Sequence, residues 1–100
     1  MQTFTGQTIF ENIISCDLLN NPVPAATFDI QLYKDDTLVS DIDITGELTD
    51  NQRAIFTFSF SAATLGSYQL YAKNNITSVI YLSEIYDVVE DEKLNIFVGL

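Results

Sequence analysis

The chain contains no histidine and no tryptophan among its 100 residues, and only four lysines and arginines accompany 14 aspartates and glutamates. Without histidine, the commonest general base and metal ligand of enzymes is missing. The formal net charge of −10 disfavours nucleic acid as a partner, because phosphate backbones are bound chiefly by lysine and arginine. The same charge disfavours an anionic membrane surface. We therefore expect neither nucleic acid nor a membrane among the partners.

Cysteine and long apolar runs are also scarce. Cys16 is the single cysteine, so neither an intrachain disulfide nor a zinc site of the usual kind can form within one chain. Its alternating apolar surroundings predict a buried, unreactive thiol. The first ten residues lack a basic start and an apolar run, and no stretch approaches the ~18 apolar residues that span a bilayer. These features predict a chain that folds in a reducing cytoplasm.

What the chain does have is 47% hydrophobic residues, which is enough for one packed core over residues 1–100. Apolar and polar residues alternate at a period of two, which indicates strands buried on one face. The clearest expected strands are residues 8–19, 27–33, 41–44, 54–60 and 67–73. The expected inward residues are Phe28, Ile30, Leu32, Ala54, Phe56, Phe58 and Phe60. Polar and proline-containing turns separate these runs, so we predict an all-β antiparallel sandwich of seven to nine strands.

The segment after residue 73 carries more apolar residues than a half-buried strand needs. Asn74-Asn75 predicts a two-residue hairpin loop, since asparagine tolerates the left-handed conformation of such turns. That loop would place Val79 and Tyr81 in the core. The residues left on the outer face are Ile76, Ile80 and Leu82, beside Tyr71. Either a bulge or a long loop covers this face, or the face meets another subunit.

The last apolar run raises the same question. Leu94, Ile96, Val98 and Leu100 alternate with Asn95, Phe97 and Gly99. Residues 93–100 are expected to form an extra strand of the sandwich or to add to the sheet edge of a neighbouring molecule. In the second case Ile96, Phe97 and Val98 belong to the interface.

One short pattern points to a fold family. Gly66, Tyr68 and Leu70 match the Gly-x-Tyr-x-core pattern at the start of strand F in immunoglobulin-like sandwiches, with Leu70 where antibody domains have cysteine. The chain therefore resembles an immunoglobulin-like domain. The resemblance implies a tyrosine corner, in which the Tyr68 hydroxyl bonds back to nearby backbone, and makes residues 54–60 strand E.

A second segment supports this resemblance. Residues 16–39, CDLLNNPVPAATFDIQLYKDDTLV, are similar to the D-x-x-x-N-P-V-P-x-A-T-V segment of bacterial Ig-like repeats in surface adhesins. Comparable modules occur in capsid decoration, head-fibre, baseplate and tail proteins of bacteriophages. Together the two resemblances cover about residues 8–89. The missing tryptophan and disulfide mean that antibody-type recognition is not implied.

The carboxylates are the only groups that suggest chemistry. Asp41 and Asp43 lie two residues apart on an expected strand face, a spacing that could suit a glycosidase pair, but a solvated sheet face explains them as well. A calcium site is the alternative to metal-free acidic clusters, because hard cations bind grouped carboxylates. Its candidate ligands are Asp35, Asp36, Asp87, Glu90, Asp91 and Glu92. We predict no catalytic residue, no cofactor and no metal site.

These observations favour a non-enzymatic structural or interaction module. The leading hypothesis is a bacteriophage virion protein that folds in the host cytoplasm and binds other virion subunits or further copies of itself. The alternative is a carbohydrate- or receptor-binding Ig-like module of a larger cell-surface protein. Exposed side chains of Tyr33, Tyr71 and Tyr86 would stack on the sugar in that case.

Overall fold

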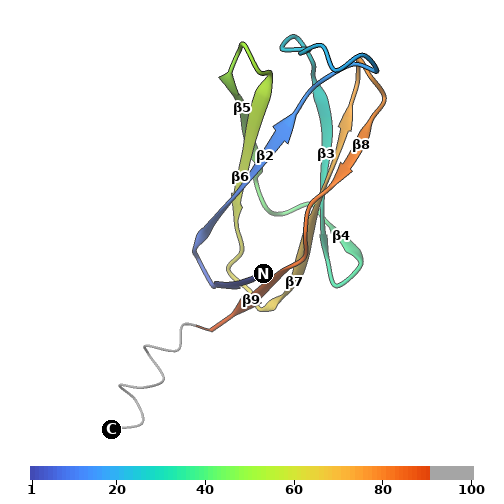
Figure 1. Cartoon of the computed structure of the whole chain (residues 1–100). Coiled ribbons are helices and arrows are strands. Elements are labelled where there is room, and N and C mark those ends of the chain that lie inside the picture. Colours follow the sequence, from blue (N-terminus) through green and yellow to red (C-terminus); the bar gives the residue numbers. More distant parts are fainter. Residues whose placement is uncertain (91–100) are drawn as a thin grey trace, which may run out of the picture.

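Two β-sheets lie face to face in the computed structural model, which describes residues 1–90 (Figure 1). Over this range the chain forms nine strands and no helix. None of the described residues therefore belongs to a helix long and apolar enough to cross a membrane. The strands are β1 (Gln2–Phe4), β2 (Thr8–Ile14), β3 (Phe28–Lys34), β4 (Thr37–Val39), β5 (Thr45–Asp50), β6 (Ile55–Ser61), β7 (Gly66–Asn74), β8 (Ile80–Leu82) and β9 (Tyr86–Val89).

The larger sheet has the order β1-β9-β7-β3-β4. On the same edge of β7, β9 pairs with residues 66–68 and β8 with residues 71–73. The smaller sheet has the order β2-β6-β5. All strand pairs are antiparallel except β1 with β9, which is parallel and departs from the expected antiparallel arrangement. The all-β, two-sheet prediction is thus confirmed.

The core lies between the two sheets and follows the alternation seen in the sequence. Phe56, Phe58 and Phe60 of β6 are all buried, as expected. Phe28 of β3 packs edge-on against Phe56 and Phe58, with ring centroids 4.9 and 5.4 Å apart. Leu32 and Leu70 fill the middle of the larger sheet. Aromatic edge-to-face packing thus contributes to a core that has no tryptophan.

The first long strand ends earlier than predicted. β2 stops at Ile14 instead of continuing to Leu19, because the chain turns back on itself after Ser15. The Ser15 carbonyl accepts a hydrogen bond from the Val23 N–H, and Cys16 forms an isolated bridge with Pro22. The expectation of a buried Cys16 is also wrong, because that residue is only partly covered.

Residues 41–44 do not form the predicted strand. They belong to an irregular crossing from β4 in the larger sheet to β5 in the smaller one. Ile42 and Ile44 still pack against the core, whereas Asp41 and Asp43 are exposed. The alternation in this segment therefore reflects burial of a connection and not strand pairing.

The β7–β8 hairpin is longer than a two-residue loop. Lys73 pairs with Ile80 and Tyr71 with Leu82, a register four residues away from the predicted one. The Asn74 N–H donates to the Val79 carbonyl and thereby closes a wider loop. Because the shift is an even number of residues, each side chain stays on its predicted face of the sheet, and Tyr81 packs against the core. Val79, however, is exposed, so the prediction that it lies in the core is wrong.

Candidate functional site

An apolar groove of about 510 Å³ opens at the end of the sandwich where the β2–β3 connection meets the β7–β8 hairpin. Both loops lie at the top of Figure 1, opposite the end at which β9 finishes. The apolar residues that line it are Ile13, Ile14, Leu18, Val23, Phe28, Ile76, Val79, Ile80 and Tyr81. Cys16, Asp17, Asn74 and Thr77 complete the lining.

The wall contributed by the β2–β3 connection is shaped by Asp17. Its carboxylate accepts hydrogen bonds from the N–H groups of Leu19 and Asn21, both at 2.9 Å. The N–H of Asn21 has the largest effect in lowering the pKa of Asp17 below its usual value. Asn20 takes a left-handed conformation, with φ of 62°, which completes the turn. This loop holds Leu18 almost wholly in solvent, at 98% exposure.

The wall contributed by the β7–β8 hairpin is held by Asn74. Its buried side-chain oxygen accepts from the N–H groups of Ile76 and Thr77, at 2.9 and 3.1 Å. Its amide nitrogen donates to the Ser15 hydroxyl at 2.8 Å, just beyond the end of β2. One side chain thus joins the two walls of the groove, and the loop that it fixes leaves Ile76 57% exposed.

Part of the predicted interface lies at this groove. Ile76 and Ile80 line it directly. Tyr71 and Leu82 form a cross-strand pair on the adjoining outer face of the larger sheet. The other predicted interface residues, Ile96, Phe97 and Val98, lie outside the described residues. The groove thus brings together two of the predicted residues and leaves two on the neighbouring face.

Sequence reasoning missed Ile14, Leu18 and Val79 as groove residues. Leu18 was expected in a strand and Val79 in the core, whereas both are exposed at the groove. One available signal was the position of Leu18-Leu19 directly before Asn20-Asn21-Pro22, since two leucines beside such a turn lack an obvious buried place.

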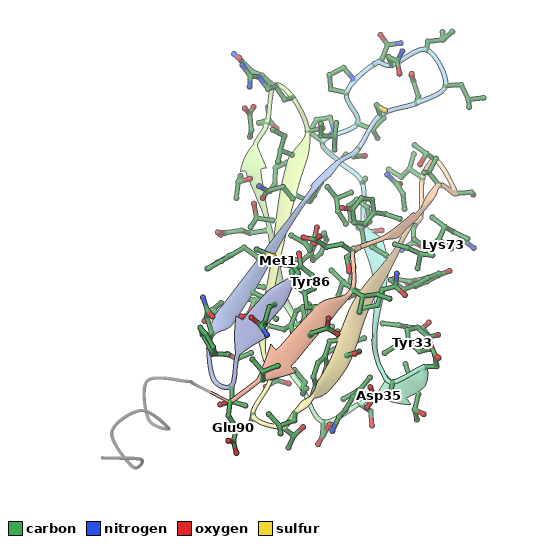
Figure 2. All side chains as sticks on the ribbon, turned by 60° about the horizontal axis from the view of Figure 1, so that its bottom comes forward. Met1, Tyr33, Asp35, Lys73, Tyr86 and Glu90 are labelled. Atoms are coloured by element: carbon green, nitrogen blue, oxygen red, sulfur yellow. The ribbon has the colours of Figure 1, made fainter. Side chains whose placement is uncertain are left out.

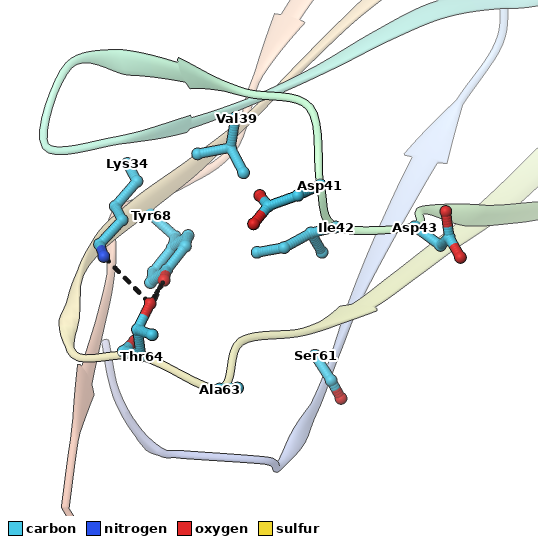
Figure 3. A pocket seen from close by; sticks show the side chains of 9 residues that line it. All are labelled: Lys34, Val39, Asp41, Ile42, Asp43, Ser61, Ala63, Thr64 and Tyr68. Carbon is cyan, nitrogen blue, oxygen red and sulfur yellow. Dashed lines mark hydrogen bonds between the residues drawn. The ribbon is translucent and has the colours of Figure 1, made fainter.

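The predicted corner residues lie at the opposite end of the sandwich. The Tyr68 ring is fully buried, and its hydroxyl donates to the Thr64 carbonyl at 3.1 Å. The same hydroxyl lies 2.8 Å from the Thr64 hydroxyl (Figure 3). The Thr64 hydroxyl in turn accepts from the Lys34 ammonium at 3.0 Å. Gly66 has φ of +156°, and a Cβ there would lie 2.7 Å from Cε of Lys34. Leu70 is fully buried beyond the corner.

A second cavity, of about 570 Å³, lies beside this corner and includes Asp41 and Asp43 in its lining. In Figure 3 the Asp41 carboxylate points into the cavity, toward Tyr68, whereas that of Asp43 points away. The two carboxylates therefore do not converge on one point. The expectation that they share a strand face is wrong, since their segment is not a strand.

The acidic residues considered for calcium are used in other ways. Among residues 1–90, no group of three or more histidine, cysteine, aspartate or glutamate side chains is placed to hold a metal ion. The Asp35 carboxylate accepts from the Ser67 N–H at 3.0 Å, and the Asp87 carboxylate accepts from the Ser67 hydroxyl at 2.7 Å. Asp36 and Glu90 are exposed, and Asp91 and Glu92 lie outside the described residues.

A buried carboxylate joins the two sheets near the middle of the sandwich. Glu11 of β2 is 8% exposed and accepts hydrogen bonds from the hydroxyls of Tyr81, at 3.0 Å, and Tyr86. Burial first, and then the bond to Glu11, raise the pKa of both tyrosines above the usual value. Tyr86, labelled in Figure 2, is 4% exposed, so the expectation of an exposed sugar-stacking side chain there is wrong.

Comparison with known proteins gives no family name. The sequence matches no protein-family model and no curated protein.

Proposed function

We propose that the chain is a non-enzymatic interaction module that acts through protein–protein contacts, as a structural component of a bacteriophage virion. The observation that carries the proposal is the apolar groove between the β2–β3 connection and the β7–β8 hairpin. Exposed apolar residues that gather around one concavity, outside the core, are typical of sites that bind another protein.

The groove is well suited to a protein partner because its walls are held in place. Asp17 fixes one loop and Asn74 fixes the other through hydrogen bonds to main-chain N–H groups. A preorganised apolar surface loses little conformational freedom on binding, so more of the burial energy appears as affinity. Ile76, Val79 and Ile80 would be covered by the partner.

The immunoglobulin-like assignment is supported by the strand order. Sheets β2-β6-β5 and β9-β7-β3-β4 correspond to the orders B-E-D and G-F-C-C′ of such sandwiches. The bond from Tyr68 to the Thr64 carbonyl matches the tyrosine corner of that fold. The likeness of residues 16–39 to adhesin-type repeats, which also occur in phage particles, is what directs the proposal to a virion.

The test is quantitative mass spectrometry of purified virus particles from cultures that produce the chain. A virion component is present in a fixed ratio to the major capsid protein from one preparation to the next. A variant with Leu18→Asn and Ile76→Asn should be lost from particles, whereas the control Leu38→Asn, on β4 and exposed about as much as Ile76, should be retained. Absence of the wild-type chain from particles would contradict the proposal.

One observation favours the alternative function of carbohydrate or receptor binding. Tyr33 and Tyr71 lie on the outer face of the larger sheet, and each pairs across the strands with a glutamine, Gln69 and Gln31 respectively. Aromatic rings flanked by amides could bind a sugar. Titration of the chain with an oligosaccharide panel, followed by tyrosine fluorescence, distinguishes the two functions, because the groove contains neither Tyr33 nor Tyr71.

A further inference from the structure

We propose that the groove binds residues 94–100 of a second copy of this chain, so that copies join head to tail. The inference rests on the proposed function and names the partner. Three features support it: the two strand edges that flank the groove, the apolar alternation of residues 94–100, and the distance between the groove and the end of β9.

The groove is bordered by strand edges that have no neighbouring strand within residues 1–90. β2 pairs only with β6, and β8 pairs only with β7. Just after β2, the Ser15 N–H donates to the carbonyl of Ala54, the residue before β6. By antiparallel alternation, the main-chain groups of Asn12 and Ile14 then point away from β6. These groups can pair with an added strand while its side chains enter the groove.

Residues 94–100 have the pattern that such a strand requires. Leu94, Ile96, Val98 and Leu100 alternate with Asn95, Phe97 and Gly99. In an extended strand, the first set would share one face. Four aliphatic side chains on one face are complementary to the apolar walls of the groove.

The same segment cannot fill the groove of its own chain. Gly66 pairs with Val88 at one end of β7, and Asn74 lines the groove at the other end. Eight residue steps along β7 span about 26 Å. Figure 2 likewise places Glu90 and Lys73 toward opposite ends of the sandwich. Since an extended chain advances at most ~3.5 Å per residue, only the last few residues of the segment could reach back that far.

A second copy meets no such limit. Its residues 94–100 would emerge from one end of its sandwich and enter the groove at the other end of the first copy. The contact joins two different surfaces, so each copy offers one groove and one segment. Such a head-to-tail contact produces rings or filaments instead of closed two-fold dimers.

The test uses two full-length variants that each disable one half of the contact. The groove variant carries Leu18→Asn and Ile76→Asn, and the segment variant carries Ile96→Asn and Val98→Asn. Light scattering on a sizing column should show wild-type mass rising with concentration and each variant alone as a monomer. An equimolar mixture of the two should give a species of twice the single-chain mass, because one intact groove and one intact segment remain.

Cys16 provides an independent readout, since it lines the groove and is the single cysteine. Alkylation of Cys16 in the segment variant should slow about tenfold when the groove variant is present at a concentration that keeps nine-tenths of the grooves occupied. Intact mass spectrometry separates the two chains by their substitutions. Restored association in the mixture also shows that both variants are folded.

Two results would overturn the inference. One is a mixture that stays monomeric while wild-type chains associate. The other is a wild-type chain that stays monomeric with Cys16 equally reactive at all concentrations. If a monomeric chain is nevertheless found in purified particles, the head-to-tail contact is wrong and the proposed virion role stands. If copies join head to tail but particles lack the chain, the virion role fails and the contact stands.

Discussion

At the scale of single residues, Glu11 is the one charged side chain that is buried among residues 1–90. A buried carboxylate is costly unless hydrogen bonds replace its water, and the hydroxyls of Tyr81 and Tyr86 supply them. The arrangement connects β2 of the smaller sheet with β8 and β9 of the larger one. Both tyrosines must stay neutral to donate, which makes the contact sensitive to alkali.

The stability of the chain should therefore fall at high pH. The folded-state pKa of Tyr86 is raised above the ordinary 10.0. Its contribution is fully present below about pH 10 and is lost as the pH rises toward the folded-state value. Guanidinium unfolding at pH 8, 9, 10 and 11 measures this dependence. Tyr86→Phe should lower the unfolding free energy at pH 8 by about 2 kcal/mol and flatten the decline above pH 10. A wild-type free energy that is level from pH 9 to 11 would contradict this.

The corner tyrosine supports a second prediction at this scale. Tyr68→Phe removes the hydrogen bond to the Thr64 carbonyl but leaves the buried ring in place. We expect a loss of about 1 kcal/mol in unfolding free energy, measured by urea denaturation with an unchanged m-value. The matched control is Tyr33→Phe, whose hydroxyl contacts the nearby Gln31 side chain on the sheet face. Equal losses in the two variants would show that the corner bond contributes nothing special.

At the scale of elements, Asn74 determines the shape of the β7–β8 hairpin. Asn74→Ala removes two bonds to main-chain N–H groups and leaves the buried Ser15 hydroxyl without its donor. We expect a loss of about 3 kcal/mol and faster hydrogen exchange over residues 75–80. Asn75→Ala is the control, since its side chain makes only long, exposed contacts. Unchanged exchange in the Asn74 variant would show that the loop is held by other contacts.

The strands of the central core could be predicted from the sequence, because their alternation matches the pairing that forms. Residues 54–60 show this, with every predicted inward residue buried in or beside β6. Residues 41–44 alternate equally well but lie in a connection, because burial of Ile42 and Ile44 does not require a strand partner. Alternation alone cannot separate these two cases.

The groove was only partly predictable because long-range contacts shape its loops. Ile76 and Ile80 were expected to face outward because side chains alternate between the two faces of a strand, and both are exposed. The hairpin register, however, depends on Asn74, whose side chain bonds to a serine 59 positions earlier. No local pattern around residue 74 carries that information, so a two-residue loop was the default expectation.

At the scale of the whole molecule, the charge of −10 acts against association between copies. Copies that meet through an apolar groove still repel one another through solvent, and salt screens this repulsion. We therefore expect self-association to strengthen from about 0.02 M to about 0.5 M sodium chloride, as the screening length falls below ~5 Å. Sedimentation velocity measures the change. Association that weakens with salt would point to ion pairs as the source of the contact.

The break between β8 and β9 limits how far a further strand could pair along this margin of the larger sheet. The Ser83 N–H still donates to the Leu70 carbonyl, but the Leu70 N–H donates to the Ser83 hydroxyl, at 2.9 Å, instead of to a main-chain carbonyl. The Ser83 hydroxyl itself donates to the Glu84 carbonyl. The sheet margin is thereby divided into β8, of three residues, and β9, which β1 already covers. A long, continuous margin is a template for amyloid-like stacking, and short or covered segments are not. A strand that added to β8 would meet only three residues of β8 before Ser83, so this margin of the larger sheet is a poor template for fibril growth.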